Sequence, residues 1–199
     1  MITFPQNIVL ENERAVLRPL QKGDIEFLLP YAINEPDTWK YSLTSPAGET
    51  GMKEYIRKAI EQREQKKEYA FIVFDKSINA YAGSTRFYDI QLNNLTTQLG
   101  YTWYGKKFRR SGLNRHCKLL MLTYAFEIWG IERVEFRADA RNEESIKAMK
   151  SIGCTVEGIL RSNTVIDSGG RRSSIVLSIL KDEWFDHVKE NLIKKTDSI

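Results

Sequence analysis

One feature of this 199-residue sequence constrains the fold most: between residues 96 and 139 the pattern of apolar residues changes from that of a strand to that of a helix and then back to that of a strand. TTQLGYTWY (96–104) is rich in β-branched and aromatic residues, which favours a strand. RVEFRAD (133–139) alternates with the period of a strand. Between them lies a helical apolar stripe that Gly130 is placed to end, made of Leu113, Cys117, Leu120, Met121, Tyr124, Ala125 and Ile128. A strand–helix–strand connection is a crossover, so the two strands should be parallel neighbours in one sheet.

The surrounding segments predict that the rest of this sheet is mostly antiparallel. YAFIVFD (69–75) and NAYAGSTRFYDI (79–90) lead into strand 96–104 through short connections, which is typical of an antiparallel meander. No repeat or linker divides the chain, so we expect one α/β domain over residues 1–199, with a central mixed sheet and flanking helices. A polar tail, about residues 190–199, is expected to fray. The remaining predicted elements are a hairpin at 8–20, helices at 23–32 (with Pro30 near its end), 51–65, 142–153 and 182–193, and strands at 154–161 and 173–180.

The composition limits the kind of partner. A net charge of +4 and a pI near 9.0 suit an anionic ligand or a nucleic acid. There is no RNA-binding motif and no dense Arg/Lys helix face, which argues against nucleic acid. No apolar run approaches membrane length and the N-terminus has no signal-peptide pattern, so we expect a cytoplasmic protein. Two cysteines and two histidines without ligand spacing predict free thiols and no metal site.

The stretch FRRSGLNRH (108–116) places positive charge and a glycine at the start of the predicted helix. A helix N-terminus exposes unpaired N–H groups with partial positive charge, which suits a phosphate group. Gly112 would let the backbone approach such a ligand without a Cβ in the way. Neither a P-loop nor a GxGxxG pattern is present. The residues alone therefore leave two interpretations open, a phosphate site or a solvated basic turn.

Three motifs carry a resemblance to a known family: Arg109-x-x-Gly112-x-Asn114, RVEFRADARNEES and SIGCTVEGILR. Together they resemble the GNAT acetyltransferase superfamily, and within it the ribosomal-protein-alanine acetyltransferase branch. The resemblance implies that acetyl-CoA binds with its pyrophosphate on the backbone at the helix start, where Asn114 stands in place of the usual Gly or Ala. It also implies that strand 96–104 splays from its parallel neighbour near Arg137 and Asp139, and that the split holds the pantetheine. The implied cofactor-binding residues are Thr102, Trp103, Tyr104, Arg109, Arg110, Ser111, Gly112, Leu113, Asn114, Asn142 and Ser145.

The residues that would carry catalysis are less well defined. Many related enzymes have a glutamate at the position of Gln98 and a tyrosine at the position of Met149, so neither usual group is present. Ser145, which could also be a helix-capping residue, and Tyr104, which could also be a core residue, are the candidate catalytic side chains. For His116 we expect a pKa lowered by the helix N-terminus and a position facing solvent or the cofactor. Cys117 and Cys154 are expected in the core, which favours direct attack over an acetyl-cysteine intermediate.

The acceptor side is predicted from two loops. Trp39 could wall an acceptor pocket, and Asp89 is a candidate anchor for the substrate amine, although a turn residue is the simpler interpretation. Charged residues of both signs occur in the same loops: Asp37, Glu49, Asp167, Arg171 and Arg172. The resulting hypothesis is an acetyl-CoA-dependent N-acetyltransferase acting on a primary amine of a protein N-terminus or a small metabolite. A non-catalytic acetyl-CoA sensor and an RNA- or ribosome-associated binding protein are the alternatives, and a homodimer is compatible with the family.

Overall fold

The computed structural model describes residues 3–4, 6–166 and 169–197. Its strands form one sheet in the order β1-β2-β3-β4-β5-β6-β8-β7, in which β5 and β6 are parallel and every other neighbouring pair is antiparallel. The strands are β1 (Leu10–Glu11), β2 (Ala15–Pro19), β3 (Tyr69–Asp75), β4 (Ala80–Gln91), β5 (Thr96–Tyr104), β6 (Arg133–Asp139), β7 (Thr155–Val165) and β8 (Arg171–Leu180). The predicted bounds of β3, β5 and β6 are confirmed to the residue.

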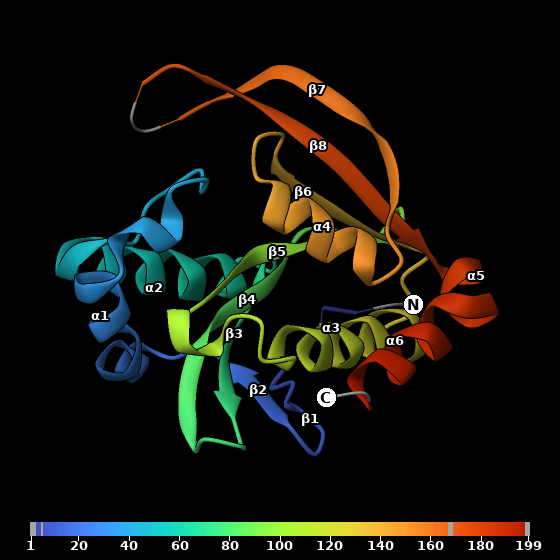
Figure 1. The fold of residues 1–199 in the computed structure, drawn as a ribbon, viewed down its shortest axis with the longest axis horizontal. Coiled ribbons are helices and arrows are strands. Elements are labelled where there is room, and N and C mark those ends of the chain that lie inside the picture. Colours follow the sequence, from blue (N-terminus) through green and yellow to red (C-terminus); the bar gives the residue numbers. More distant parts are fainter. Residues whose placement is uncertain (1–2, 5, 167–168, 198–199) are drawn as a thin grey trace.

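Helices cover both faces of the sheet (Figure 1). The helices are α1 (Ile25–Asn34), α2 (Gly48–Glu64), α3 (Leu113–Thr123), α4 (Glu143–Ser151), α5 (Lys181–Glu183) and α6 (Lys189–Thr196). Helices α1 and α2 pack together over one face, and α3 lies with α6 over the other. The β7–β8 hairpin extends beyond the rest of the sheet (Figure 1). In the part of the chain that the structure describes, no helix is long and apolar enough to cross a membrane.

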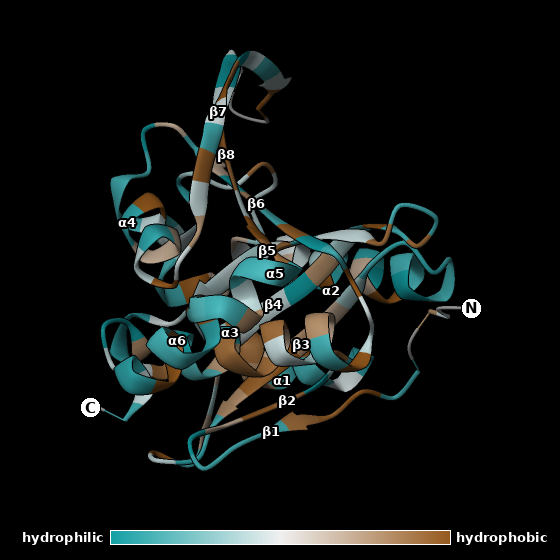
Figure 2. Cartoon of the chain, turned by 90° about the vertical axis from the view of Figure 1, so that its right-hand side faces the viewer, coloured by the Kyte–Doolittle hydropathy of each residue, from teal (hydrophilic) through white to brown (hydrophobic). Residues whose placement is uncertain are grey.

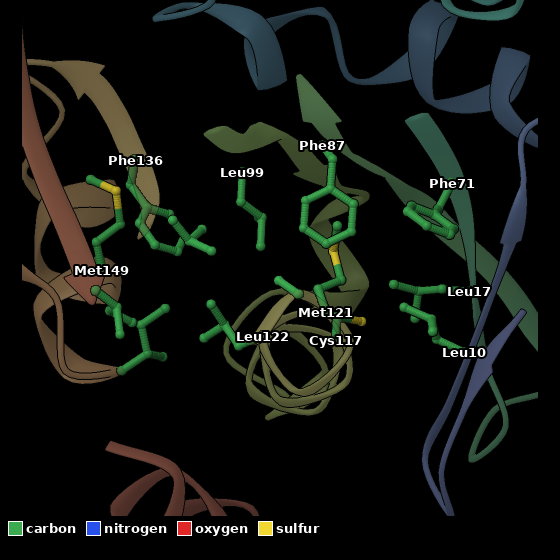
Figure 3. Packing of buried hydrophobic residues seen from close by; sticks show 14 of the residues in the cluster. Leu10, Leu17, Phe71, Phe87, Leu99, Cys117, Met121, Leu122, Phe136 and Met149 are labelled. Atoms are coloured by element: carbon green, nitrogen blue, oxygen red, sulfur yellow. The ribbon is translucent and has the colours of Figure 1, made fainter. Parts of the chain in front are cut away.

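Each face of the sheet has its own hydrophobic core. The larger core joins α3 to the sheet, with Met121 and Leu122 directed toward the strand residues Phe87 and Leu99 (Figure 3). The smaller core lies under α1 and α2 and includes Trp39 and Trp103. Hydrophilic colour dominates α4 and α6 on their outer sides (Figure 2). Because α3 and α2 cover opposite faces of the sheet and the side chains of a strand alternate between its faces, successive β5 side chains point in turn toward α3 and toward α2.

The apolar stripe predicted for residues 113–129 is wrong at its end. Tyr124–Ile128 forms a π-helical turn, which holds one residue more per turn than an α-helix. The extra residue rotates the following side chains, so Phe126 is buried and Ile128 is 70% exposed. Gly130 does end the helix, in a left-handed conformation with φ 78°.

Two further expectations about helix ends are corrected by packing. The tail predicted to fray from about residue 190 is helical as far as Thr196, because Leu192 and Thr196 are buried beside α3. Pro30 lies inside α1 rather than near its end, and the helix continues to Asn34. Here the burial of Leu28 and Ala32 under α2 outweighs the cost of an interior proline.

Candidate active site

The centre of the site is an opening between β5 and β6. The parallel ladder consists of Thr96 opposite Arg133, Thr97 opposite Val134 and Gln98 opposite Glu135. Beyond this last pair β5 is paired only with β4, and β6 only with β8. The backbone edges that face each other from Leu99 and Phe136 onward are therefore unpaired, which confirms the predicted splay.

A β-bulge in β5 bends the strand away at this opening. Arg86 of β4 lies opposite Gly100 and Ser84 opposite Trp103, so Tyr101 and Thr102 together face the single residue between them on β4. Tyr101 has a positive φ of 48°, a conformation that few non-glycine residues adopt. A bulge of this kind increases the local twist and ends regular pairing, which explains why β5 leaves β6 here.

The start of α3 lies at the end of the loop that follows β5. Gly112 adopts a left-handed conformation with φ 86° and immediately precedes the helix. The Ser111 hydroxyl donates to the Phe108 carbonyl over 2.7 Å, which fixes the loop. Among the described residues no acceptor at hydrogen-bond geometry faces the backbone N–H groups of Arg110, Ser111, Gly112 and Asn114. Four unpaired donors at a helix N-terminus make a site for an anionic group.

The two arginines of the loop have different surroundings. Arg109 donates from Nε to the Tyr104 carbonyl over 3.2 Å and from Nη2 to Thr38 Oγ1 over 2.9 Å. It thereby ties the end of β5 to the Pro36–Trp39 turn. Arg110 is exposed and forms an ion pair of 2.7 Å with Glu144 in the first turn of α4. Positive charge therefore lies at the rim of the helix start, where Arg110 is exposed to solvent and paired with Glu144.

The two predicted catalytic side chains lie on different elements. Tyr104 is buried and donates from its hydroxyl to Asn114 Oδ1 over 3.2 Å, and burial raises its pKa well above the ordinary value of 10.0. Ser145 is in the first turn of α4, and its N–H donates to Asn142 Oδ1 over 3.1 Å, so Asn142 caps the helix. In the described chain no hydrogen bond joins the hydroxyls of Tyr104 and Ser145.

A cavity of about 300 Å³ lies between the loop that precedes α2 and the end of β6. Trp39 lines it and packs edge-on against Trp103, with ring centroids 5.1 Å apart. The Trp39 Nε1 atom is buried without a hydrogen-bond partner in the described structure. Asp139 also lines the cavity, and its hydrogen bonds with Arg141 hold the pKa of its carboxyl below the usual range. The cavity thus combines an aromatic wall with an ionised carboxylate.

The other predicted substrate residue, Asp89, is outside this cavity. Asp89 is exposed within β4, with a φ of 46°, and its Oδ2 accepts from Gln98 Nε2 over 2.8 Å. Gln98 is itself buried, and its Oε1 has no partner among the described residues. Position 98, where many related enzymes have a glutamate, therefore holds the Gln98 amide, which is hydrogen-bonded to the carboxylate of Asp89. This pair marks the point where β5 and β6 part.

The remaining charged loop residues are spread over the surface and the hairpin. Asp37 lines the cavity, whereas Glu49 pairs with Lys53 one turn along α2. Asp167 lies outside the described residues. Arg171 donates to the Ser162 carbonyl, and Arg172 is buried and donates from Nη1 to the Tyr41 carbonyl over 3.1 Å. Arg172 therefore anchors the loop that carries Trp39 instead of forming an exposed hairpin tip.

The expected position of His116 is wrong. Its side chain is buried, and Nδ1 lies 3.0 Å from Glu13 Oε1 in the turn between β1 and β2. It faces neither solvent nor the opening between β5 and β6. Its pKa is lowered as expected, but the main cause is desolvation by burial.

Three cations are buried that the sequence pattern did not single out: Lys118, Arg86 and Arg172. Lys118 belongs to α3, and Leu122 one turn further on is fully buried, so the inner face of the helix includes position 118. Arg86 occupies an inward position of β4, where it pairs with Glu68 over 2.6 Å and lies between the rings of Tyr55 and Tyr101. The sequence signal that could have revealed such a buried cation is a charged residue on a helix or strand face whose other residues are apolar.

A parallel strand pair that parts, together with a helix start whose N–H groups are unpaired, is typical of the acetyltransferase class of α/β domains, and comparison with known proteins agrees with this assignment. The family model described as "Acetyltransferase (GNAT) domain" matches residues 14–155. The chain belongs to this GNAT family and is an N-acetyltransferase.

Individual relatives cover almost the whole chain. The "Putative ribosomal N-acetyltransferase YdaF" of Bacillus subtilis is 26% identical over 180 residues, which span 87% of this chain and 94% of that protein. The solved GCN5-related N-acetyltransferase from Brucella melitensis is similar with a TM-score of 0.88 and 22% identity, covering 96% of this chain and 86% of that one. The ribosomal-protein-S5-alanine acetyltransferase from Vibrio fischeri shares the fold with a TM-score of 0.69 and 19% identity, covering 89% and 99%.

Proposed function

We propose that this protein transfers the acetyl group of acetyl-CoA to a primary amine by direct attack while both molecules are bound. The observation that carries the proposal is the end of β5–β6 pairing at Gln98 and Glu135, beyond which β5 continues unpaired with β6 to Tyr104, beside the free N–H groups at the start of α3. An extended pantetheine arm can pair with open strand edges, and a pyrophosphate suits the helix start.

The residues present fit acetyl-CoA. The N–H groups of Arg110, Ser111, Gly112 and Asn114 would hold the pyrophosphate, with the exposed Arg110 guanidinium nearby. The unpaired edge of β5 around Thr102, Trp103 and Tyr104 would hold the pantetheine, and the capped start of α4 at Asn142 and Ser145 would flank it. When bound, the co-substrate supplies an acetyl group activated as a thioester. Backbone N–H groups in the opening would stabilise negative charge on its carbonyl oxygen.

The acceptor pocket favours an amine that loses its proton readily. An α-amino group has a pKa near ~8 and a lysine side chain near ~10.4, so the former is partly neutral at cellular pH. Gln98 cannot act as a base, which makes an α-amine the easier substrate. The Trp39 ring and the Asp139 carboxylate would attract the amine in its charged form before the transfer. A protein N-terminus and a small metabolite both satisfy these requirements.

The cysteines support direct attack rather than a covalent acetyl-enzyme. Cys117 and Cys154 are buried, and burial raises the pKa of each thiol to about 12. A thiol with so high a pKa is a poor nucleophile at neutral pH, because the thiolate is the reactive form.

The test is calorimetric titration of acetyl-CoA into the native protein and three variants. Gly112→Asp places a carboxylate at the helix start and should abolish binding, and Arg110→Glu should weaken it. Gly48→Asp is the matched control, because Gly48 also has a positive φ, 72°, at the start of a helix, and no atom lies within 4 Å of a Cβ there. A folded native protein that does not bind acetyl-CoA would overturn the proposal.

Turnover is then measured as release of CoA with peptides and small amines as acceptors. Binding without turnover on any amine would favour the sensor hypothesis. Acetylation of peptide N-termini but not of lysine side chains would support the α-amine preference.

A further inference from the structure

Lys118 has an unusual position for a lysine. It is in the second turn of α3 and is only 5% exposed. Its Nζ donates to Thr102 Oγ1 of β5 over 2.9 Å and lies 5.8 Å from the ring centroid of Phe136 on β6. These two strand residues both lie beyond the last β5–β6 pair. The amino group therefore lies at the floor of the opening, on the α3 side of the sheet.

No carboxylate of the described residues balances this amino group. Within the described chain no Asp or Glu oxygen lies within 4.0 Å of Lys118 Nζ. Thr102 Oγ1 accepts the hydrogen bond from Lys118 and forms a second hydrogen bond with Thr85 Oγ1, at 2.7 Å. An unpaired buried charge is costly for a folded protein, and such groups are usually paired. An anion that arrives with a ligand would supply the missing partner.

The groups around Lys118 set its proton affinity. The thiols of Cys117 on the same helix and Cys154 just after α4 are the titratable groups that act on it. β5 and β6 contribute the uncharged Thr102 and Phe136. Desolvation by burial lowers the pKa of Lys118 to about 8. A free thiol has a pKa near ~8.5, so a proton can pass between these two groups with little cost in free energy.

We propose that Lys118 is a catalytic residue that donates a proton from Nζ to the sulfur of CoA as this sulfur leaves the acetyl group. The inference rests on the proposed function, because it requires acetyl-CoA in the β5–β6 opening. A pantetheine arm that runs along the open edge of β5 from the start of α3 passes over Thr102 and hence over the Lys118 amino group.

The proposed step conserves protons and electron pairs. The acceptor nitrogen forms a bond to the acetyl carbon, and the carbon–sulfur bond breaks with its electron pair on sulfur. The sulfur takes a proton from the Lys118 ammonium, which becomes a neutral amine. The acceptor nitrogen releases its proton to solvent, and Lys118 takes one from solvent, so the net products are the amide and CoA with a free thiol.

Other groups near the opening are less suited to this step. Tyr104 is held by Asn114, and its pKa is well above 10.0, which makes it a weak acid at neutral pH. Met149 on α4 is buried and has no proton to give. Of these three groups, Lys118 is the one whose proton is available near neutral pH.

The first experiment measures the pKa of the CoA thiol in the complex by the ultraviolet absorbance of the thiolate. An adjacent ammonium should lower this pKa by about 1 to 3 units relative to the complex with Lys118→Met. The protein's own buried thiols, with pKa about 12, do not ionise in the same range. Lys67→Met, at an exposed position in the turn after α2, is the control and should match the native protein.

The second experiment compares kcat in Lys118→Met and Lys118→Arg with the best acceptor found. Both variants should lose about 100-fold or more, because arginine keeps the charge but does not release its proton. Replacing a buried lysine by methionine preserves or raises stability, so thermal unfolding should show folded variants. Recovery of kcat by arginine would overturn proton donation.

The outcomes separate this inference from the proposed function. If the native protein binds neither CoA nor acetyl-CoA, both are wrong. If the native protein binds and turns over acetyl-CoA but Lys118→Met has the same thiol pKa and the same kcat, only the role of Lys118 is wrong.

Discussion

Gln98 of β5 lies opposite Glu135 of β6 in the last pair of the only parallel ladder among the described strands. On one side of this pair the two strands are joined, and on the other they part around the floor that Lys118 provides. The amide of Gln98 is in turn bonded to Asp89 on β4. The end of one ladder thus locates the opening between the strands, the Gln98 amide bonded to Asp89, and the buried lysine.

The bulge that opens the site depends on a close approach of β4 to β5 at Gly83. A Cβ at this position would lie 2.0 Å from the carbonyl oxygen of Trp103, a backbone atom that cannot turn aside. We expect Gly83→Ala to lower the free energy of unfolding by about 2 to 3 kcal/mol, measured by urea denaturation. Gly23→Ala, with no atom within 4 Å of the new Cβ, should change it little. Equal stability of the two variants would contradict this close approach of the two strands.

Burial of His116 should make stability depend on pH. Because its pKa in the folded protein is below the ordinary value of 6.5, the unfolded chain binds a proton first as the pH falls. The contribution of the neutral, buried His116 side chain to the free energy of unfolding is complete above pH 6.5, and it is lost as the pH falls through the pKa of His116 in the folded protein. The free energy of unfolding of the native protein should decline between neutral and acidic pH more steeply than that of His116→Gln. If the free energies of unfolding of the native protein and of His116→Gln fell in parallel with pH, the ion pair with Glu13 would offset the cost of burying a charged His116.

Substitution of Trp39 should change the KM for the acceptor more than it changes the stability of the fold. Trp39→Phe keeps an aromatic ring against Trp103 but removes the buried N–H that has no partner. We expect the KM for the acceptor to rise about fivefold to tenfold while the Kd of acetyl-CoA stays the same. Trp129→Phe is the control, since its N–H is bonded to the Thr3 carbonyl in the other core. That variant should lose stability without a change in KM.

The two thiols should be inert in the native state. With pKa values raised to about 12 by burial, Cys117 and Cys154 should not react with an aromatic disulfide reagent at neutral pH, and both should react after unfolding. The double variant Cys117→Ala, Cys154→Ala should still transfer acetyl groups. Mass spectrometry after incubation with acetyl-CoA should find no acetylated cysteine, and finding one would contradict direct attack.

The sequence by itself determined the elements around the site. The periods of residues 69–75, 96–104 and 133–139 gave the bounds of three strands, because alternation and β-branched composition act within a few neighbouring residues. Gly112 before α3 and Asn142 before α4 are local signals of the same kind, and both hold. The crossover between β5 and β6 followed from the order of these elements.

Only the tertiary structure decided which side chains are buried and what they face. The environments of Lys118 and His116 depend on residues far away in the chain, Thr102 and Glu13 respectively, which no local period encodes. The π-turn that exposes Ile128 has the same origin in packing. Local rules fix the conformation of a segment over a few residues. The solvation of a charge depends on everything packed around it, and this packing exists only once distant segments have met.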